Sequence, residues 1–266
     1  MKKKADILIV DDEQVVIDAV TKICSSLGLS VDASTDAHSG LEKIRSSDYR
    51  LVICDVMLPE MDAFQFLKRV TEAHVSVPVI LITGYSTAEN AVKSLNSGAT
   101  AYVAKPFTEN ELLSAIHRAM RLAEILRAET ETGRKSGQAK RPPVPMPGTY
   151  RLGNISWVVL EPTGTGRIGA AEMFVKSIST LREIELFQDD DEILQGSLCA
   201  RIQSDDGLSH DVLSPLSGRI IQSNKELLTN LKILEHDPHV QGWLYRIIPS
   251  AMEYEVRNLL PYSEGR

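Results

Sequence analysis

The sequence predicts two domains of different class: a doubly wound α/β domain with a parallel (βα)5 sheet, followed by a β-rich domain. Three observations lead to this prediction. Short apolar runs alternate five times with helical patterns through about residue 126, residues 128–149 are polar and then proline-rich, and strand patterns separated by turns begin at residue 150. Alternation at this spacing is typical of a parallel sheet with helices on both faces. A chain of 266 residues is long enough for two such domains.

The five expected strands of the first domain are short and apolar, as strands buried on both faces are. They span residues 7–10, 30–33, 51–54, 77–83 and 101–104. Apolar residues recur at helical spacing between them, and Thr35 or Asp36 can cap the second helix. Thr108 and Glu111 form a capping box before a last helix that runs to about Leu126. We therefore assign residues 1–127 to this domain.

The segment 128–149 predicts a linker, flexible at first and then extended, because glycine, serine and charged residues give way to four prolines. The second domain, residues 150–266, has strand patterns at 155–160, 182–187, 197–202, 219–222 and 243–248. Residues 170–176 and 224–234 favour short helices, and residues 250–260 favour a closing amphipathic helix. We expect a small barrel-sandwich-hybrid-like fold with peripheral helices.

Composition and charge exclude several classes of protein. The net charge of −7 gives no overall basic field that would attract nucleic acid or an anionic membrane. No apolar run approaches the roughly 18 residues of a membrane span, so the cytoplasm is the simplest location. The three cysteines, Cys24, Cys54 and Cys199, are far apart and set among apolar neighbours, which favours buried thiols over a disulfide or metal site.

Polar residues follow four of the five strands of the first domain. Asp11 and Asp12 come after the first strand, Asp55 ends the third, Thr83 the fourth and Lys105 the fifth. The carboxyl ends of parallel strands share one edge of the sheet, where ligands bind, so we expect these side chains to meet. Each alone would be a helix cap or a solvated charge, but together they predict a site. Three carboxylates repel one another unless a cation joins them, and oxygen ligands suit Mg²⁺.

This set of groups suits phosphoryl transfer, which requires a positioned nucleophile and neutralisation of the phosphoryl oxygens. The Asp55 carboxylate is the candidate nucleophile and phosphoacceptor. Mg²⁺ and Lys105 would neutralise charge, and the Thr83 hydroxyl would donate a hydrogen bond to the product.

The motifs Val10-Asp11-Asp12-Glu13, Asp55-Val56-Met57-Leu58-Pro59, Thr83-Gly84 and Lys105-Pro106-Phe107 resemble the receiver domain of two-component response regulators, which has a flavodoxin-like fold. The resemblance covers roughly residues 5–126. It implies phosphorylation of Asp55 by a cognate histidine kinase, with Mg²⁺ held by Asp11, Asp12, Asp55 and the backbone carbonyl of Met57.

The same resemblance implies a cis peptide between Lys105 and Pro106, and a switch in which Thr83 moves and Tyr102 rotates inward. Ordinary packing is the alternative role for Tyr102. Ala63 departs from the glycine that the family often has there, which leaves the acceptor chemistry intact. The apolar stripe of the last helix packs on the sheet in its first half, and beyond Leu122 it could pair as a coiled coil in a homodimer.

A DNA-binding output domain is not expected from residues 151–266. They contain 11 Lys and Arg against 17 Asp and Glu, a balance of −6, and show neither a basic stripe nor a helix-turn-helix pattern. His236 and His239 flank Asp237-Pro238 but lack further metal ligands in view. The Thr163-Gly164-Thr165-Gly166 run lacks the ending of a phosphate loop and predicts a turn.

Other motifs in this half resemble the glycine-cleavage H protein, a lipoyl carrier. They are Ser214-Pro215-Leu216-Ser217-Gly218, the thirteen-residue step from Asn224 to Asp237, and Gly242-Trp243-Leu244. The resemblance covers roughly residues 154–250. It implies a lipoyl lysine eight residues before Pro215, but position 207 is glycine, and Asp205-Asp206-Gly207 predicts an ordinary hairpin turn. No lipoyl amide can form there without an amine.

The sequence therefore predicts a response regulator that is a switch and not an enzyme. Its receiver would control the protein interactions of a non-lipoylated H-protein-like domain with a partner that the sequence does not identify. Two alternatives stay open: a transcription regulator with an unrecognised mode of DNA binding, and a lipoyl-type carrier in glycine cleavage.

Overall fold

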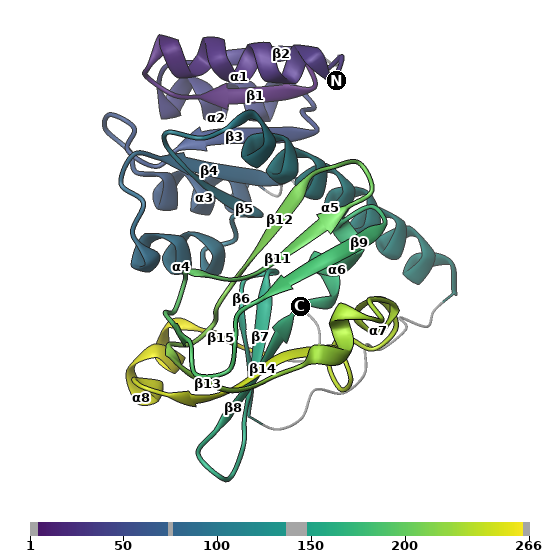
Figure 1. The fold of residues 1–266 in the computed structure, drawn as a ribbon. Coiled ribbons are helices and arrows are strands. Elements are labelled where there is room, and N and C mark those ends of the chain that lie inside the picture. Colours follow the sequence, from purple (N-terminus) through teal and green to yellow (C-terminus); the bar gives the residue numbers. More distant parts are fainter. Residues whose placement is uncertain (1–4, 74–76, 137–147, 263–266) are drawn as a thin grey trace. The chain divides into compact units, whose positions relative to one another are not determined.

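The computed structural model describes residues 5–73, 77–136 and 148–262 (Figure 1). Contacts between Cα atoms divide the chain into two compact units. The first comprises Met1–Ser86 and Ser97–Ala123, and the second comprises Thr87–Asn96 and Glu124–Arg266. Each unit is built around buried apolar residues of its own sheets.

The first unit contains the predicted five-stranded parallel sheet, in the order β2-β1-β3-β4-β5. Its strands are β1 (Ile7–Val10), β2 (Val31–Ser34), β3 (Leu51–Asp55), β4 (Val79–Thr83) and β5 (Ala101–Ala104). Every residue of β1, β3 and β4 is buried, because both faces of the sheet are covered. This explains why these strands are continuous apolar runs in the sequence. The fold class predicted for this half is confirmed.

Helices alternate with these strands: α1 (Gln14–Ser26), α2 (Ala37–Ser46), α3 (Ala63–Glu72), α4 (Ala88–Asn96) and α5 (Glu109–Ser136). Leu8 and Val10 share one core with residues of α2 and α3, whereas Ile7 and Ile9 share the other with residues of α1 and α5. The predicted caps form. Asp36 accepts a hydrogen bond from the Ser39 N–H, and Thr108 and Glu111 make the capping box.

The α5 helix is longer than the sequence predicted. It continues to Ser136 and so includes the start of the segment assigned to the linker, residues 128–149. The predicted boundary was drawn at the change to polar residues. That change marks the end of the buried stripe, whose last member is Leu122, rather than the end of the helix. The proline-rich part of the predicted linker lies outside the described residues, and strand β6 already begins at Thr149.

The second unit is antiparallel and β-rich, as predicted. One sheet has seven strands in the order β10-β13-β14-β8-β7-β6-β15, and another has three in the order β12-β11-β9. The first sheet comprises β6 (Thr149–Leu152), β7 (Ser156–Leu160), β8 (Gly166–Ala170), β10 (Glu192–Ile193), β13 (Gly218–Ser223), β14 (Trp243–Pro249) and β15 (Leu260–Pro261). The second comprises β9 (Leu181–Leu186), β11 (Leu198–Ser204) and β12 (Ser209–Leu213). Ile168, Ile247 and Ile202 belong to one core supplied by both sheets, as in a sandwich.

All five strands predicted here exist within one or two residues of their predicted ends, and α6 (Glu172–Ser177) is the predicted first helix. The 224–234 run forms a 3-10 helix, η1 (Lys225–Leu228), and a short α7 (Lys232–His236). The long closing helix was wrong, because residues 250–260 form only α8 (Met252–Glu255), η2 (Val256–Asn258) and the start of β15. The run at 163–166 is a turn that leads into β8, as predicted.

Two further expectations concern bonding and membranes. Cys24, Cys54 and Cys199 are buried free thiols, as predicted. Within the described ranges, no helix combines the length and the apolar character that crossing a membrane requires.

Candidate functional site

The carboxyl edge of the parallel sheet gathers the predicted polar residues. Asp55 is the last residue of β3 and Thr83 the last of β4, while Asp11 and Lys105 directly follow β1 and β5. Asp11 and Thr83 are fully buried and Asp55 is 4% exposed. Burial of a carboxylate is costly unless a partner compensates its charge, so the contacts of these groups decide what the edge can do.

Lys105 is the centre of these contacts. Its ammonium Nζ lies 2.8 Å from Asp55 Oδ1, 2.9 Å from Asp11 Oδ2 and 2.9 Å from Glu13 Oε1. An ammonium has three donors, and these three carboxylates use all of them. Burial alone lowers the pKa of Lys105, but hydrogen bonds to Asp55, Asp11 and Glu13 outweigh it and raise the pKa. The lysine therefore stays charged at neutral pH.

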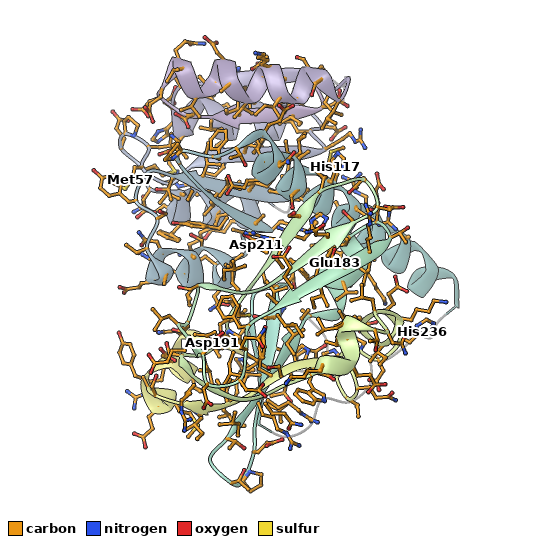
Figure 2. The ribbon with its side chains drawn as sticks, viewed as in Figure 1. Met57, His117, Glu183, Asp191, Asp211 and His236 are labelled. Carbon is orange, nitrogen blue, oxygen red and sulfur yellow. The ribbon has the colours of Figure 1, made fainter. Side chains whose placement is uncertain are left out.

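The remaining oxygens of the two buried carboxylates accept backbone hydrogen bonds. The Met57 N–H donates to Asp55 Oδ2 over 2.5 Å, and the Glu13 N–H donates to Asp11 Oδ1 over 2.9 Å. Met57 lies in the loop after β3, with an exposed side chain (Figure 2). Burial raises the pKa of the Asp11 carboxyl, against the opposing effect of Lys105. The fold thus disfavours the charged form of Asp11 relative to water, and such a perturbed carboxyl group is typical of a functional site.

The donor set fits a hard divalent cation in chemistry and charge. Asp11, Asp12, Asp55 and Glu13 carry four negative charges against the single positive charge of Lys105, which leaves a net charge of −3 that a divalent cation would reduce. Asp12 is exposed and can reorient, and no ready-made group of three acidic, histidine or cysteine ligands occurs among the described residues. Lys105 joins Asp11 to Asp55, so a cation that joins the same two carboxylates would compete with the ammonium for their oxygens.

Thr83 and Tyr102, the predicted switch residues, both contact Tyr85. The Thr83 hydroxyl accepts a hydrogen bond from the Tyr85 N–H at 3.1 Å, and the Tyr102 hydroxyl donates to the Tyr85 carbonyl at 3.4 Å. Burial raises the pKa of Tyr102 to about 12. Tyr102 is partly buried and packs against the core, so its ordinary packing role is present in this state. The Lys105–Pro106 peptide bond is cis, as predicted.

The second unit has a tight hairpin at the place where the resemblance to the H protein implies a lipoyl lysine. Gly207 lies between β11 and β12 with a φ of +81°, and its N–H donates to the Ser204 carbonyl. Asp205 accepts from the Ser179 hydroxyl, and hydrogen bonds hold the pKa of Asp205 below its usual value. Asp206 accepts from the Ser204 hydroxyl and from the Leu208 N–H. The predicted hairpin turn is confirmed.

The two histidines that flank Asp237-Pro238, His236 and His239, contact groups other than a metal ligand set. His236 Nδ1 lies 2.8 Å from the Lys232 carbonyl oxygen. The His239 ring packs between Trp157 and Tyr262, with ring centroids 5.5 and 5.7 Å away. Their contacts are those of a helix end and an aromatic cluster.

Glu13 belongs to the Val10-Asp11-Asp12-Glu13 motif, but the sequence alone predicted no role for its side chain. Its carboxylate contacts Lys105 as closely as Asp11 does. The available signal was its position, because Glu13 follows Asp11 and Asp12 at the same strand end. Tyr85 was also missed, since its backbone rather than its side chain contacts Thr83 and Tyr102.

Two known families match separate parts of the chain. Residues 7–117 match the response regulator receiver domain, and residues 149–264 match the glycine cleavage H-protein. Neither match depends on the contacts described above, and the receiver match contains Asp11, Asp55, Thr83 and Lys105.

Curated relatives match the first half of the chain. The transcriptional regulatory protein DltR of Streptococcus agalactiae is 38% identical over 122 residues, which cover 46% of this chain and 54% of DltR. The response regulator protein TodT of Pseudomonas putida is 35% identical over 124 residues, 46% of this chain and 55% of TodT. The transcriptional regulatory protein HprR of Escherichia coli is 36% identical over 125 residues, 47% of this chain and 56% of HprR.

The chain thus spans about half the length of the curated relatives that it matches. The glycine cleavage H-protein match begins only at residue 149, after the receiver match has ended at residue 117. The chain therefore joins a region that matches the response regulator receiver domain to a region that matches the glycine cleavage H-protein.

Proposed function

We propose that this protein is a response regulator in which Asp55 accepts a phosphoryl group from a histidine kinase. Phosphorylation then switches the protein–protein interactions of the H-protein-like domain. The observation that supports the acceptor role best is the single ammonium of Lys105 on the two buried carboxylates Asp55 and Asp11. A charge-compensated carboxylate at the end of a buried strand is a nucleophile in a fixed position, and phosphoryl transfer depends mainly on such positioning.

The chemistry at Asp55 forms one bond and breaks one. A carboxylate oxygen of Asp55 attacks phosphorus, an O–P bond forms, and the P–N bond to the kinase histidine breaks with its electron pair returning to the imidazole. Lys105 keeps one charged donor beside the acceptor, and the Met57 N–H fixes the orientation of the carboxylate. Asp11, Asp12, Asp55 and the Met57 carbonyl would hold Mg²⁺, which would neutralise charge on the phosphoryl oxygens.

Thr83 and Tyr102 are the proposed switch residues. The Thr83 hydroxyl is free to donate its own proton, because in its contact with the Tyr85 N–H it acts as the acceptor. A hydrogen bond from Thr83 to the phosphoryl group draws on that proton, and the backbone of Tyr85 connects this event to the hydroxyl of Tyr102.

The acceptor assignment is tested with the full chain, Mg²⁺ and acetyl phosphate as phosphoryl donor, read by intact-mass spectrometry. The wild type should gain one phosphoryl group and Asp55→Asn none, because an amide is not a nucleophile here. Asp48→Asn makes the same change at an exposed aspartate and should behave as the wild type. An equal gain of mass in Asp55→Asn would contradict the proposal.

The same proteins test the output. Affinity capture with the full chain should retain a different set of proteins after phosphorylation, and Asp55→Asn should retain the unphosphorylated set. Enzymes that handle lipoyl domains are one class of partner to look for, and the receiver itself is another. Identical capture in both states would contradict phosphorylation-gated binding.

Two alternatives have less support. In the proposed function the H-protein-like domain is not lipoylated, since Gly207 stands at the hairpin where the lysine was sought. A lipoyl mass on any lysine of the native protein would instead establish a carrier. DNA binding is disfavoured by the −6 balance of residues 151–266, and salt-dependent binding to duplex DNA would support it.

A further inference from the structure

Glu13 lies at a helix N-cap, but its side chain does not cap the helix. It is the N-cap of α1, a place where short polar side chains accept a hydrogen bond from the first turn. Asp36 and Asp62 do this at α2 and α3, accepting from the Ser39 and Gln65 N–H groups over 2.8 Å each. The Glu13 side chain makes no cap hydrogen bond to the described helix. Its carboxylate is directed instead to Lys105.

The three carboxylates on Lys105 differ in what they do when Mg²⁺ enters. Asp11 and Asp55 belong to the proposed metal ligands, so a metal ion there would compete with the ammonium for their oxygens. Glu13 is outside that set and is 56% exposed on its side chain. Among the described partners of the Lys105 ammonium, Glu13 is the one that is not a proposed metal ligand.

We infer that Glu13 is a positioning residue that holds Lys105 while Mg²⁺ takes its place on Asp11. This inference rests on the proposed function, because it requires the metal to bind at these carboxylates. With Glu13 present, the ammonium of Lys105 can leave the Asp11 carboxylate and still keep its contact with the Glu13 carboxylate. Without it, Lys105 stays more firmly on Asp11 and Asp55 and competes with the metal for both.

The substitution Glu13→Gln isolates this role. Glutamine keeps the length of the side chain and removes its charge. The Glu13 N–H on Asp11 is a backbone group and is retained, and no side-chain cap is lost. The matched control is Asp18→Asn, which removes one charge from an exposed side chain of α1 whose described hydrogen bond is to Gln14.

The measurement is Mg²⁺ binding to the full chain by calorimetry, without phosphoryl donor. We expect Glu13→Gln to bind Mg²⁺ about threefold more weakly, a factor within the range of exposed ion pairs. Asp18→Asn should bind as the wild type does. In a Lys105→Met background, Glu13→Gln should change the affinity by a smaller factor, because the lysine through which Glu13 acts is absent.

The outcomes separate this inference from the proposed function. If the wild type binds Mg²⁺ and Glu13→Gln binds it equally well, the inference fails and the metal site stands. An equal or larger loss in the Lys105→Met background would mean that Glu13 attracts the metal directly, which also overturns it. If the wild type binds no Mg²⁺, the proposed metal site fails and the positioning role fails with it.

Discussion

The pKa values of aspartates are shifted in opposite directions at two places: the carboxyl edge of the receiver sheet and the β11–β12 hairpin. In the receiver, burial raises the pKa of Asp11, and two buried carboxylates share one lysine. At the hairpin, hydroxyl and backbone donors lower the pKa of Asp205, and at Asp206 they outweigh burial, which alone would raise the pKa. The receiver carboxylates keep a net negative charge that a ligand could neutralise. The hairpin carboxylates are already stabilised by hydrogen bonds from neighbouring residues. The difference teaches where chemistry can occur in this chain.

The largest effect on stability is expected at Ser204, whose hydroxyl contacts several polar groups of the hairpin. The buried Ser204 hydroxyl donates to Asp206 and lies 2.9 Å from His210 Nε2. Ser204→Ala takes one partner from each of these groups, so the free energy of unfolding should fall by about 2 kcal/mol. Denaturation followed by tryptophan fluorescence measures it, since both tryptophans, Trp157 and Trp243, lie in the second unit.

The control for this prediction is Ser209→Ala, at the start of β12, which should change stability little. If both alanine variants unfold at the same denaturant concentration as the wild type, the hairpin cluster is not the structural element that the comparison assumes.

A pair of substitutions tests the comparison directly. Asp206→Asn should destabilise the second unit by about 0.5 kcal/mol, because the fold favours its carboxylate but solvent screens this exposed group. Asp11→Asn should stabilise the first unit in Mg²⁺-free buffer, because the fold disfavours the Asp11 carboxylate. Amide hydrogen exchange, read peptide by peptide, reports each unit separately. Shifts of the same sign in both variants would remove the distinction between the two sites.

The receiver site could be predicted from the sequence because parallel topology converts strand ends into neighbours. Each of Asp11, Asp55, Thr83 and Lys105 directly ends or follows an apolar run, so no knowledge of side-chain packing was required to bring them together. The role of Glu13 could not be predicted in this way, since the choice between a helix cap and Lys105 depends on side-chain geometry.

The second unit was less predictable because tertiary contacts decide its elements. β8 was missed, since a glycine-rich run has low strand propensity. A Cβ on Gly169 would lie 2.4 Å from the Trp157 ring, so the packing requires glycine in this strand. The predicted closing helix ends early at Glu255, whose buried carboxylate accepts hydrogen bonds from the Ser217 N–H and hydroxyl. The sequence pattern contains no signal for that contact.

The smallest effect is expected at His239, which extends the comparison from carboxylates to an imidazole. Burial lowers the pKa of His239 below the usual 6.5, although Glu172 and Asp237 oppose the shift. The unfolded chain therefore takes up the proton first as the pH falls. The free energy of unfolding of the second unit should decrease below pH 6.5, until the pH reaches the lower pKa of the folded state.

His239→Phe keeps an aromatic ring between Trp157 and Tyr262 and removes the titrating group, so this part of the pH dependence should disappear. His236→Phe, at the exposed end of α7, is the matched control and should retain it. Denaturation curves followed by tryptophan fluorescence between pH 5 and 8 are the measurement, since this is the interval in which histidine titrates. If His239→Phe loses stability with falling pH as steeply as the wild type, burial of this ring does not penalise its charge, and the comparison does not extend to the imidazole.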